Sequence, residues 1–505
     1  MSDVASSWTA LTEHCAEIDV LEGATGVLGW DQQTNLPKGA AAARGAQLAL
    51  MSRLLHERAT DSRIEGWLRD LEGGDLDELQ AASLRNMRRG YDRIVKVPAD
   101  LVVRLSTASS DGFGAWIHAK EHNDFAFFAP HLENLVALKR EKAHAIDPDV
   151  HPYDALLTGY DPGATTADLR VMFARLREGL VELIDAVRDV EAMPLVDGKF
   201  AVEAQMALNT EVATALGYDF NRGRMDAAEH PFTIGLHADD VRITTHLYET
   251  NLLGGLGGTV HESGHAMYEQ GLPKQHAGTG INRAASIGLH ESQSRFWENY
   301  IGRSQPFFNW FQPLLEKHFP GCGVSADDLY RGANRVVPGL IRVTADEVTY
   351  NLHIIARFEL EVALMEGSLA VADLPEAWNE KYRKYLGITP PDDARGVLQD
   401  VHWSGGAFGY FPSYTLGNLY AASLGATMTS ELDDLWGRVE AGDFSPILSW
   451  LRDRIHQHGH MLDAPDRMRV VVGERDSVED LLAYLWGRHG TLHGLTRPGR
   501  QSIGL

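Results

Sequence analysis

Cysteine is almost absent from this chain, with only Cys15 and Cys322 among 505 residues. So few thiols exclude the disulfide framework of a small secreted domain and favour a cytoplasmic protein. No run approaches the roughly 20 apolar residues that span a bilayer. The N-terminal residues also lack the basic and then apolar pattern of a signal peptide. We therefore expect no membrane association.

Positive charge is also scarce, because 46 Lys and Arg face 70 Asp and Glu, which gives a net charge of -24. An acidic balance of this size disfavours nonspecific binding to nucleic acids and to anionic membranes. Hydrophobic residues make up 44% of the chain, as is ordinary for globular proteins. The length is sufficient for a large buried core.

No fixed-period repeat, low-complexity tract or Pro/Ser-rich linker divides the chain. We therefore expect residues 1–505 to form a single domain, mainly α-helical, with two lobes around a cleft. Apolar residues recur with a helical period over several long segments. The predicted helices cover residues 6–23, 40–59, 98–122 and 124–146, and a further helix begins at Thr165-Thr166 and runs to about Val190.

Two stretches depart from the helical pattern. Residues 230–245 place Phe232, Ile234, Val241 and Ile243 at period two, which predicts a short β-hairpin. Residues 402–418 are rich in glycine and aromatic residues, which indicates a structured loop.

The strongest chemical signal is the sequence His261-Glu262-Ser263-Gly264-His265. On a helix, residues i and i+4 share a face, so both imidazoles can bind one metal ion. Glu262 lies about 100° around the helix from His261, beside the ion, where it can act as the base for the attacking water. Such a motif also arises by chance on a surface helix, so its companions decide its meaning.

A catalytic zinc usually takes three protein ligands and keeps one position open. The metzincin class would need a third histidine six residues after His265, but that position is Gly271. The other common solution is a glutamate from a following helix, and Glu291 is our predicted third ligand. Its neighbour His290 is the rival, and an outer-shell or capping role is its more ordinary interpretation. Glu269 and Glu298 are also close in sequence, and Glu269 fits an outer-shell role.

Further motifs identify a resemblance to the carboxypeptidase Taq family of metallocarboxypeptidases. Their order along the chain is that of the family. They are Trp30-Asp31 to Pro37 (WDxxTxxP), His230-Pro231-Phe232 (HPF), Asp240 to Thr244 (DxRxT), residues 261–265 (HExxH), residues 290–293 (HES/GQ), Ile341 to Asp346 (IRxxAD) and Gly396 to Trp403 (GxxQDxHW).

The resemblance implies a fold similar to neurolysin and the angiotensin-converting peptidases, in which two helical lobes face a deep groove with the metal at its base. It also implies one divalent metal per subunit, zinc or alternatively cobalt, and a homodimer. The implied activity removes single C-terminal residues from peptides with broad specificity. Two alternatives stay open: an oligoendopeptidase or peptidyl-dipeptidase on the same fold, and a noncatalytic metal-binding protein, which would have no need of Glu262.

Peptide hydrolysis also needs a donor for the oxyanion, and an exopeptidase must bind a free carboxylate. Tyr410 and Tyr414 are candidates for the oxyanion donor, and His230 and His402 are further ones. Arg342 is our predicted partner of the carboxylate, because the guanidinium fork matches two oxygens. Arg242, in the predicted hairpin, would orient the peptide. The structural alternative for Arg342 is an ion pair with a nearby acid.

Overall fold

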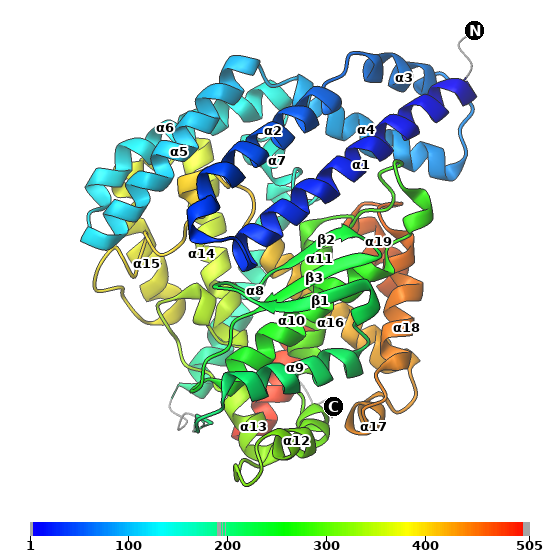
Figure 1. The fold of residues 1–505 in the computed structure, drawn as a ribbon. Helices are drawn as coiled ribbons and strands as arrows, with labels where there is room; N and C mark the ends of the chain where they lie inside the picture. The colour runs from blue at the N-terminus through cyan, green and yellow to red at the C-terminus, as the bar shows by residue number, and fades with distance from the viewer. Residues whose placement is uncertain (1–3, 189–192, 194, 197, 498–505) are drawn as a thin grey trace.

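The computed structural model describes residues 4–188, 193, 195–196 and 198–497. Most of these residues are helical, and one three-stranded sheet accompanies the helices (Figure 1). Among the described residues, no helix combines the length and apolar composition that a membrane span requires.

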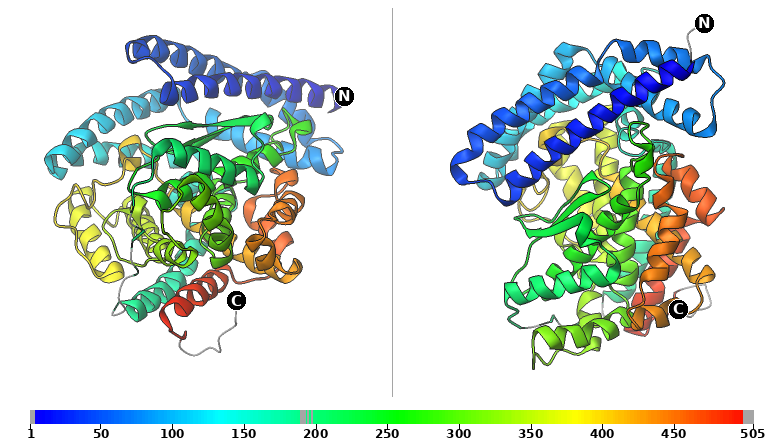
Figure 2. Two further views of the ribbon diagram at one scale, coloured as in Figure 1. Left: turned by 60° about the horizontal axis from the view of Figure 1, so that its bottom comes forward. Right: turned by 45° about the vertical axis from the view of Figure 1, so that its right-hand side comes forward.

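The first helices form a layer that covers one side of the molecule (Figure 2). They are α1 (Val4–Thr34), α2 (Ala41–Ala59), α3 (Arg63–Glu72), α4 (Glu78–Val95), α5 (Ala99–His122), α6 (Phe125–Ile146) and α7 (Pro152–Leu157). The predicted break between α5 and α6 is confirmed, because Asn123 ends α5 in the left-handed region with φ 54°.

The remaining helices build the body of the molecule. They are α8 (Thr166–Val187), α9 (Val202–Leu216), α10 (Leu252–Gly271), α11 (Ile287–Arg295), α12 (Gln305–His318), α13 (Ala326–Ala333), α14 (Glu347–Glu366), α15 (Leu374–Leu386), α16 (Pro412–Glu431), α17 (Leu435–Glu440), α18 (Ser445–Arg454), α19 (Ala464–Val472), α20 (Ser477–Leu485) and α21 (Thr491–His493). The Thr165 side chain caps α8 as predicted. The expected end of that helix near Val190 lies outside the described residues.

The predicted hairpin is confirmed as the antiparallel pair β2 (Thr233–His237) and β3 (Asp240–Thr245). A third strand, β1 (Gly223–Ala227), was not predicted, and it pairs in parallel with the other edge of β3. Its residues, Gly-Arg-Met-Asp-Ala, lack the β-branched and aromatic residues that mark a strand. β2 is thus an edge strand, and it contacts both α1 and α10.

The prediction of a loop over residues 402–418 is wrong for its second half. A 3₁₀ turn covers His402–Gly405, and α16 begins at Pro412. Proline in the first turn of a helix removes no hydrogen bond, so this residue begins the helix rather than prolonging the loop.

Candidate active site

The helix α10 carries the HExxH sequence and is held close to α11. The Asn251 side chain accepts a hydrogen bond from the Gly254 amide and begins α10, which ends at Gly271 as predicted. A Cβ atom on Gly264 would lie 2.6 Å from the Gln293 carbonyl oxygen. Glycine at this position therefore lets the two helices approach closely enough to bring Glu291 to the two histidines.

His261, His265 and Glu291 form one cluster of potential ligand atoms, all within 4.8 Å of one another. A carboxylate oxygen of Glu291, Oε2, lies 3.3 Å from His265 Nε2 and 3.7 Å from His261 Nε2. Two imidazole nitrogens and one carboxylate oxygen are the donor set of a catalytic zinc site with an open position. The residues present therefore fit a single divalent ion.

The other nitrogen of each histidine ring is occupied by an outer partner. His261 Nδ1 lies 2.8 Å from Glu298 Oε2, and His265 Nδ1 contacts His290. His290 in turn lies 2.7 Å from Glu269 through its Nε2 atom. These contacts orient both Nε2 atoms toward Glu291, and they place His290 and Glu269 outside the cluster.

Burial and neighbouring charges set the protonation states of His265 and Glu291. Burial and the adjacent His290 lower the pKa of His265 to about 3, which keeps this ring in the neutral form that binds metals. Burial alone would raise the pKa of Glu291, but Arg295 and the two histidines hold that pKa well below its usual range. Arg295 Nε donates to Glu291 Oε1 over 2.7 Å and leaves Oε2 for the histidines.

Glu262 is buried beside the cluster and is held from the sheet. The Thr233 hydroxyl, at the start of the edge strand β2, donates to Glu262 Oε2 over 2.7 Å. Burial raises the pKa of Glu262, against the opposing effect of His261. A carboxylate whose pKa is raised is a stronger base than an exposed one.

The predicted oxyanion donors lie in two places. Tyr410 and Tyr414 pack edge to face, with ring centroids 5.4 Å apart, and the Glu291 charge helps to raise the pKa of both phenols, after burial. His402 packs 4.6 Å from Phe411, and its Nδ1 atom is buried without a partner among the described residues. His230 is exposed, and its backbone carbonyl accepts from the Thr244 hydroxyl.

Arg342 and Arg242, the two arginines that we expect to contact the substrate, each form an ion pair with a carboxylate. Arg342 is buried, and its Nε and Nη2 atoms both lie 2.9 Å from Asp400 Oδ1. Its ion-pair partner is thus Asp400 and not the nearby Asp346 or Glu347. Asp400 therefore occupies both of these nitrogen atoms. It lies 58 residues away in the sequence, so only folding brings it to Arg342.

The Arg242 guanidinium is paired with Asp240, which lies two residues earlier in the sequence. Its Nε and Nη2 atoms donate to the two carboxylate oxygens of Asp240 over 2.9 and 2.8 Å. The same guanidinium stacks 4.4 Å from the Trp30 ring centroid, which joins the DxRxT segment to the N-terminal WDxxTxxP segment.

Comparison with known proteins agrees with this geometry. Residues 10–489 match the model of the carboxypeptidase Taq (M32) metallopeptidases. The chain belongs to the M32 family. It is therefore a metal-dependent carboxypeptidase, which is a peptide hydrolase, and the resemblance inferred from its motifs is confirmed.

Relatives of this M32 peptidase cover nearly its whole length. Thermostable carboxypeptidase 1 of Thermus thermophilus is 44% identical and aligns over 97% of this chain and 99% of its own. Carboxypeptidase 1 of Bacillus subtilis is 37% identical, and the alignment covers 93% of this chain and 95% of the relative. The crystal structure of the M32 carboxypeptidase from Deinococcus radiodurans R1 has a TM-score of 0.94 at 38% identity, and it covers 97% of this chain and 100% of its own.

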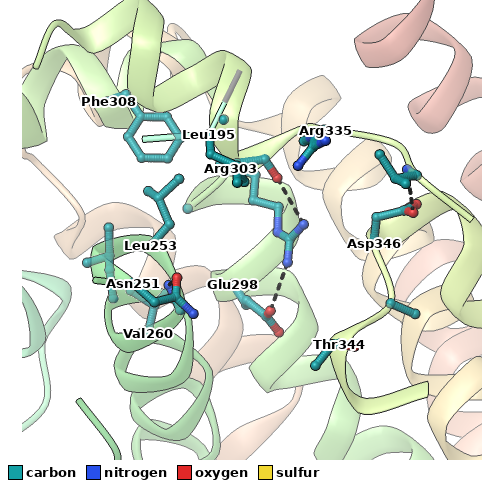
Figure 3. Close-up of a pocket in the computed structure, with 18 residues that line it drawn as sticks. Leu195, Asn251, Leu253, Val260, Glu298, Arg303, Phe308, Arg335, Thr344 and Asp346 are labelled. Carbon is teal, nitrogen blue, oxygen red and sulfur yellow. Dashed lines mark hydrogen bonds and ion pairs between the residues drawn. The ribbon is translucent and has the colours of Figure 1, made fainter. Parts of the chain in front are cut away.

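Two cavities extend along α10 of this M32 peptidase in opposite directions. One, of about 340 Å³, lies along the N-terminal half of the helix and is lined by Val260, which precedes His261, and by Glu298 (Figure 3). The other, of about 780 Å³, lies between α1, β2 and the C-terminal end of α10, where Glu269 lines it. The metal cluster lies between them along the helix.

Sequence reasoning assigned no role to several residues of the site, although it named Glu298 as close in sequence to the predicted ligands. Glu298 follows Glu291 by seven residues and so shares its helical face, a signal that could have predicted its contact with the cluster. Thr233 follows the HPF motif directly. Arg295 follows Glu291 by four residues, a spacing that could have predicted their ion pair. Asp400 gave no local signal, because both of its arginine partners are distant in sequence.

Proposed function

We propose that this M32 peptidase removes single residues from the C-terminal ends of peptides, with broad specificity, in one catalytic domain of residues 1–505. His261, His265 and Glu291 would hold one divalent ion, zinc or alternatively cobalt. The observation that carries the proposal is the cluster of these three residues, with Glu262 buried beside it.

When bound, the ion would polarise the scissile carbonyl and lower the pKa of a water molecule. Glu262 would accept a proton from that water and later pass it to the leaving amine. Since Thr233 donates to Oε2 of Glu262, the other oxygen, Oε1, is left for this proton.

The oxyanion would be stabilised by a phenol from the aromatic segment after His402. We assign this role to Tyr410 and Tyr414 together and leave His230 and His402 as alternatives. A phenol can donate a hydrogen bond without carrying charge at neutral pH, and burial keeps both phenols protonated. Arg342 would position Tyr414, whose ring centroid lies 5.2 Å from its guanidinium.

The homodimer and the cytoplasmic location remain part of the proposal. Neither cysteine is paired, as expected of a protein from a reducing compartment. An exposed apolar strip on α5 and α6 offers a surface for a second copy of the chain.

Mass spectrometry of an N-terminally blocked peptide would test the proposed activity. We expect a ladder of products that differ by single C-terminal residues. A chelator should abolish the ladder, and zinc or cobalt should restore it. Internal cleavage, or release of dipeptides, would instead support the oligoendopeptidase or peptidyl-dipeptidase alternative.

A further inference from the structure

The helix that carries Glu291 does not continue regularly. α11 ends at Arg295, and a π-helical turn over Phe296–Ile301 follows it directly. Such turns are rare and often occur at functional sites. Glu291, Arg295 and Glu298 are four and three residues apart, so they share one face of this segment. That face contacts the two histidines of α10, and its charged side chains are therefore close to the metal cluster.

Arg295 bridges two carboxylates that serve different members of the cluster. Its Nε atom donates to Glu291 Oε1 over 2.7 Å, and its Nη1 atom donates to Glu298 Oε2 over 3.1 Å. The same Glu298 oxygen lies 2.8 Å from His261 Nδ1. One guanidinium thus connects the proposed third ligand of the metal with the outer partner of the first ligand.

The contact with Arg295 distinguishes the two carboxylate oxygens of Glu291. Oε1 accepts from the guanidinium, whereas Oε2 lies 3.3 Å from His265 Nε2 and 3.7 Å from His261 Nε2. The Ser294 hydroxyl is 3.1 Å from Oε2, but its shorter hydrogen bond, of 2.6 Å, goes to the Glu291 carbonyl. Oε2 is therefore the oxygen offered to an ion, while Arg295 engages Oε1.

The same guanidinium lies over an aromatic ring. Arg295 Cζ is 4.6 Å from the centroid of the Tyr350 ring, which is 7% exposed. The Tyr350 ring packs edge to face on Tyr414, with the ring centroids 6.2 Å apart. Because Tyr414 is a proposed donor to the oxyanion, Arg295 connects this donor, through Tyr350, with the metal ligand Glu291.

These contacts need the shape of arginine as well as its charge. The side chains of Arg295, Glu291 and Glu298 are 15%, 7% and 12% exposed, so salt screens the two ion pairs little. A guanidinium offers several donors in one fixed plane and stacks on aromatic rings, whereas an ammonium is a point charge. A lysine could neutralise a carboxylate here, but it could not hold both carboxylates and the ring in one arrangement.

We propose that Arg295 is a positioning residue for the peptidase reaction. It fixes Glu291 as a ligand through one oxygen, and it fixes this ligand relative to Glu298 and to the ring that packs on Tyr414. The inference rests on the proposed metal site, of which Arg295 is not itself a ligand. The competing interpretation is that Arg295 only neutralises two buried acids, as a structural ion pair does.

The test compares Arg295→Lys and Arg295→Met with the control Arg303→Met. Arg295→Lys keeps the charge, so it separates charge from geometry, and it decides the test if Arg295→Met fails to fold. Arg303 is the matched control, because it donates to the other oxygen of Glu298, Oε1, over 3.2 Å. No hydrogen bond or ion pair links Arg303 to Glu291 within the described part of the chain. Circular dichroism of the metal-free proteins checks the fold of each variant.

Binding of cobalt(II) to the metal-free proteins gives the first measurement. Both Arg295 variants should lower the affinity for cobalt about 10–100-fold, as the loss of an outer partner typically does. They should also change the visible absorption spectrum of the bound cobalt, which reports the number and geometry of its ligands. The reason is that Glu291, once its Oε1 atom is released, can bind through both oxygens. Arg303→Met should keep the spectrum of the unmutated protein.

Peptide hydrolysis at saturating zinc gives the second measurement. Arg295 acts on the metal ligand and on Tyr414 rather than on the binding of the peptide. Both Arg295 variants should therefore lower kcat and kcat/KM equally, by about tenfold or more, and leave KM nearly unchanged.

The outcomes distinguish this inference from the metal site on which it rests. If Arg295→Lys keeps the cobalt affinity, the spectrum and the kcat of the unmutated protein, Arg295 only neutralises charge and the inference is overturned. It is also overturned if Arg303→Met changes the spectrum as much as Arg295→Lys does. If His261→Ala leaves the cobalt affinity unchanged, the proposed metal site itself fails.

Discussion

Glu262 and Glu291 are both buried glutamates near the two histidines, yet their surroundings assign them different chemistry. Glu291 receives the Arg295 guanidinium and stays ionised, as its proposed role of metal ligand requires. Among the described residues, the Glu262 carboxylate receives the Thr233 hydroxyl and no cation, and burial raises its pKa, as suits its proposed role of accepting and releasing a proton.

Glu262→Gln should keep the metal and lose hydrolysis, because an amide cannot accept the proton while the three ligands are untouched. We expect kcat to fall by at least about a hundredfold, the usual contribution of a general base. Metal content by mass spectrometry and turnover of a peptide check this together. Turnover near that of the unmutated protein would remove Glu262 from the mechanism.

Glu291→Ala should lower metal affinity more than His290→Ala does, because only Glu291 faces both Nε2 atoms. His290 supports His265 from outside, and loss of such a partner typically lowers affinity about 10–100-fold. Competition titrations with a metal indicator measure the metal affinities of both variants. The reverse order would make His290 the third ligand.

At the scale of elements, glycines set the distances between the helices that form the site. α11 contacts α16 extensively, and a Cβ atom on Gly417 of α16 would lie 2.5 Å from Glu291 Cγ. The position of the third ligand thus depends on the absence of one side chain on the neighbouring helix.

Gly417→Ala should therefore displace Glu291 and weaken metal binding, and overpacking should cost about 1–3 kcal/mol of stability. Gly90→Ala on α4 is the matched control, since a Cβ atom there would meet nothing within 4 Å. The control should be slightly more stable than the unmutated protein. Thermal unfolding measures the stability of both variants, and metal titration measures their metal affinity. Normal metal affinity in Gly417→Ala would show that α11 can shift without loss.

At the scale of the whole molecule, one buried carboxylate joins segments that are distant in the sequence. Glu361 of α14 accepts from the Tyr153 hydroxyl, the Trp403 indole and the Gly409 amide. Burial raises the pKa of Glu361 to about 7, although these donors act in the opposite direction.

Because this pKa is raised on folding, the contribution of Glu361 to stability is full below about pH 4.5 and declines as the pH rises through about 7. Relative to Glu361→Gln, the unfolding free energy of the unmutated protein should fall by about 2–3 kcal/mol over that range. Chemical denaturation at several pH values measures the difference. Parallel pH curves for the two proteins would show that Glu361 is not neutral when buried.

The proposed dimer can be tested at the exposed apolar strip. Val103, Phe113 and Ile117 lie within an arc of about 80° on α5, and they are 65%, 47% and 46% exposed. Phe113→Asp should convert the dimer to a monomer in light-scattering measurements. Val171→Asp, at an exposed apolar position on α8, should not. A dimer that survives Phe113→Asp would place the interface elsewhere.

The sequence alone determined the features that depend on neighbours along the chain. Two histidines four residues apart must share a helical face, so the proposed metal pair and the proposed base beside it followed from HExxH. The hairpin followed in the same way from period-two alternation, and the break at Asn123 and the start of α8 at Thr165 followed from local signals, whereas the helix predicted over residues 6–23 extends to Thr34.

Only the tertiary structure decided which distant groups meet. Glu291 and His290 are adjacent in sequence, and the approach of α11 to α10 at Gly264 determined which of them faces the histidines. Asp400 occupies Arg342 from 58 residues away, whereas Arg335 has no partner among the described residues. Long-range pairing depends on how helices pack, and no local pattern records whether an arginine is already paired.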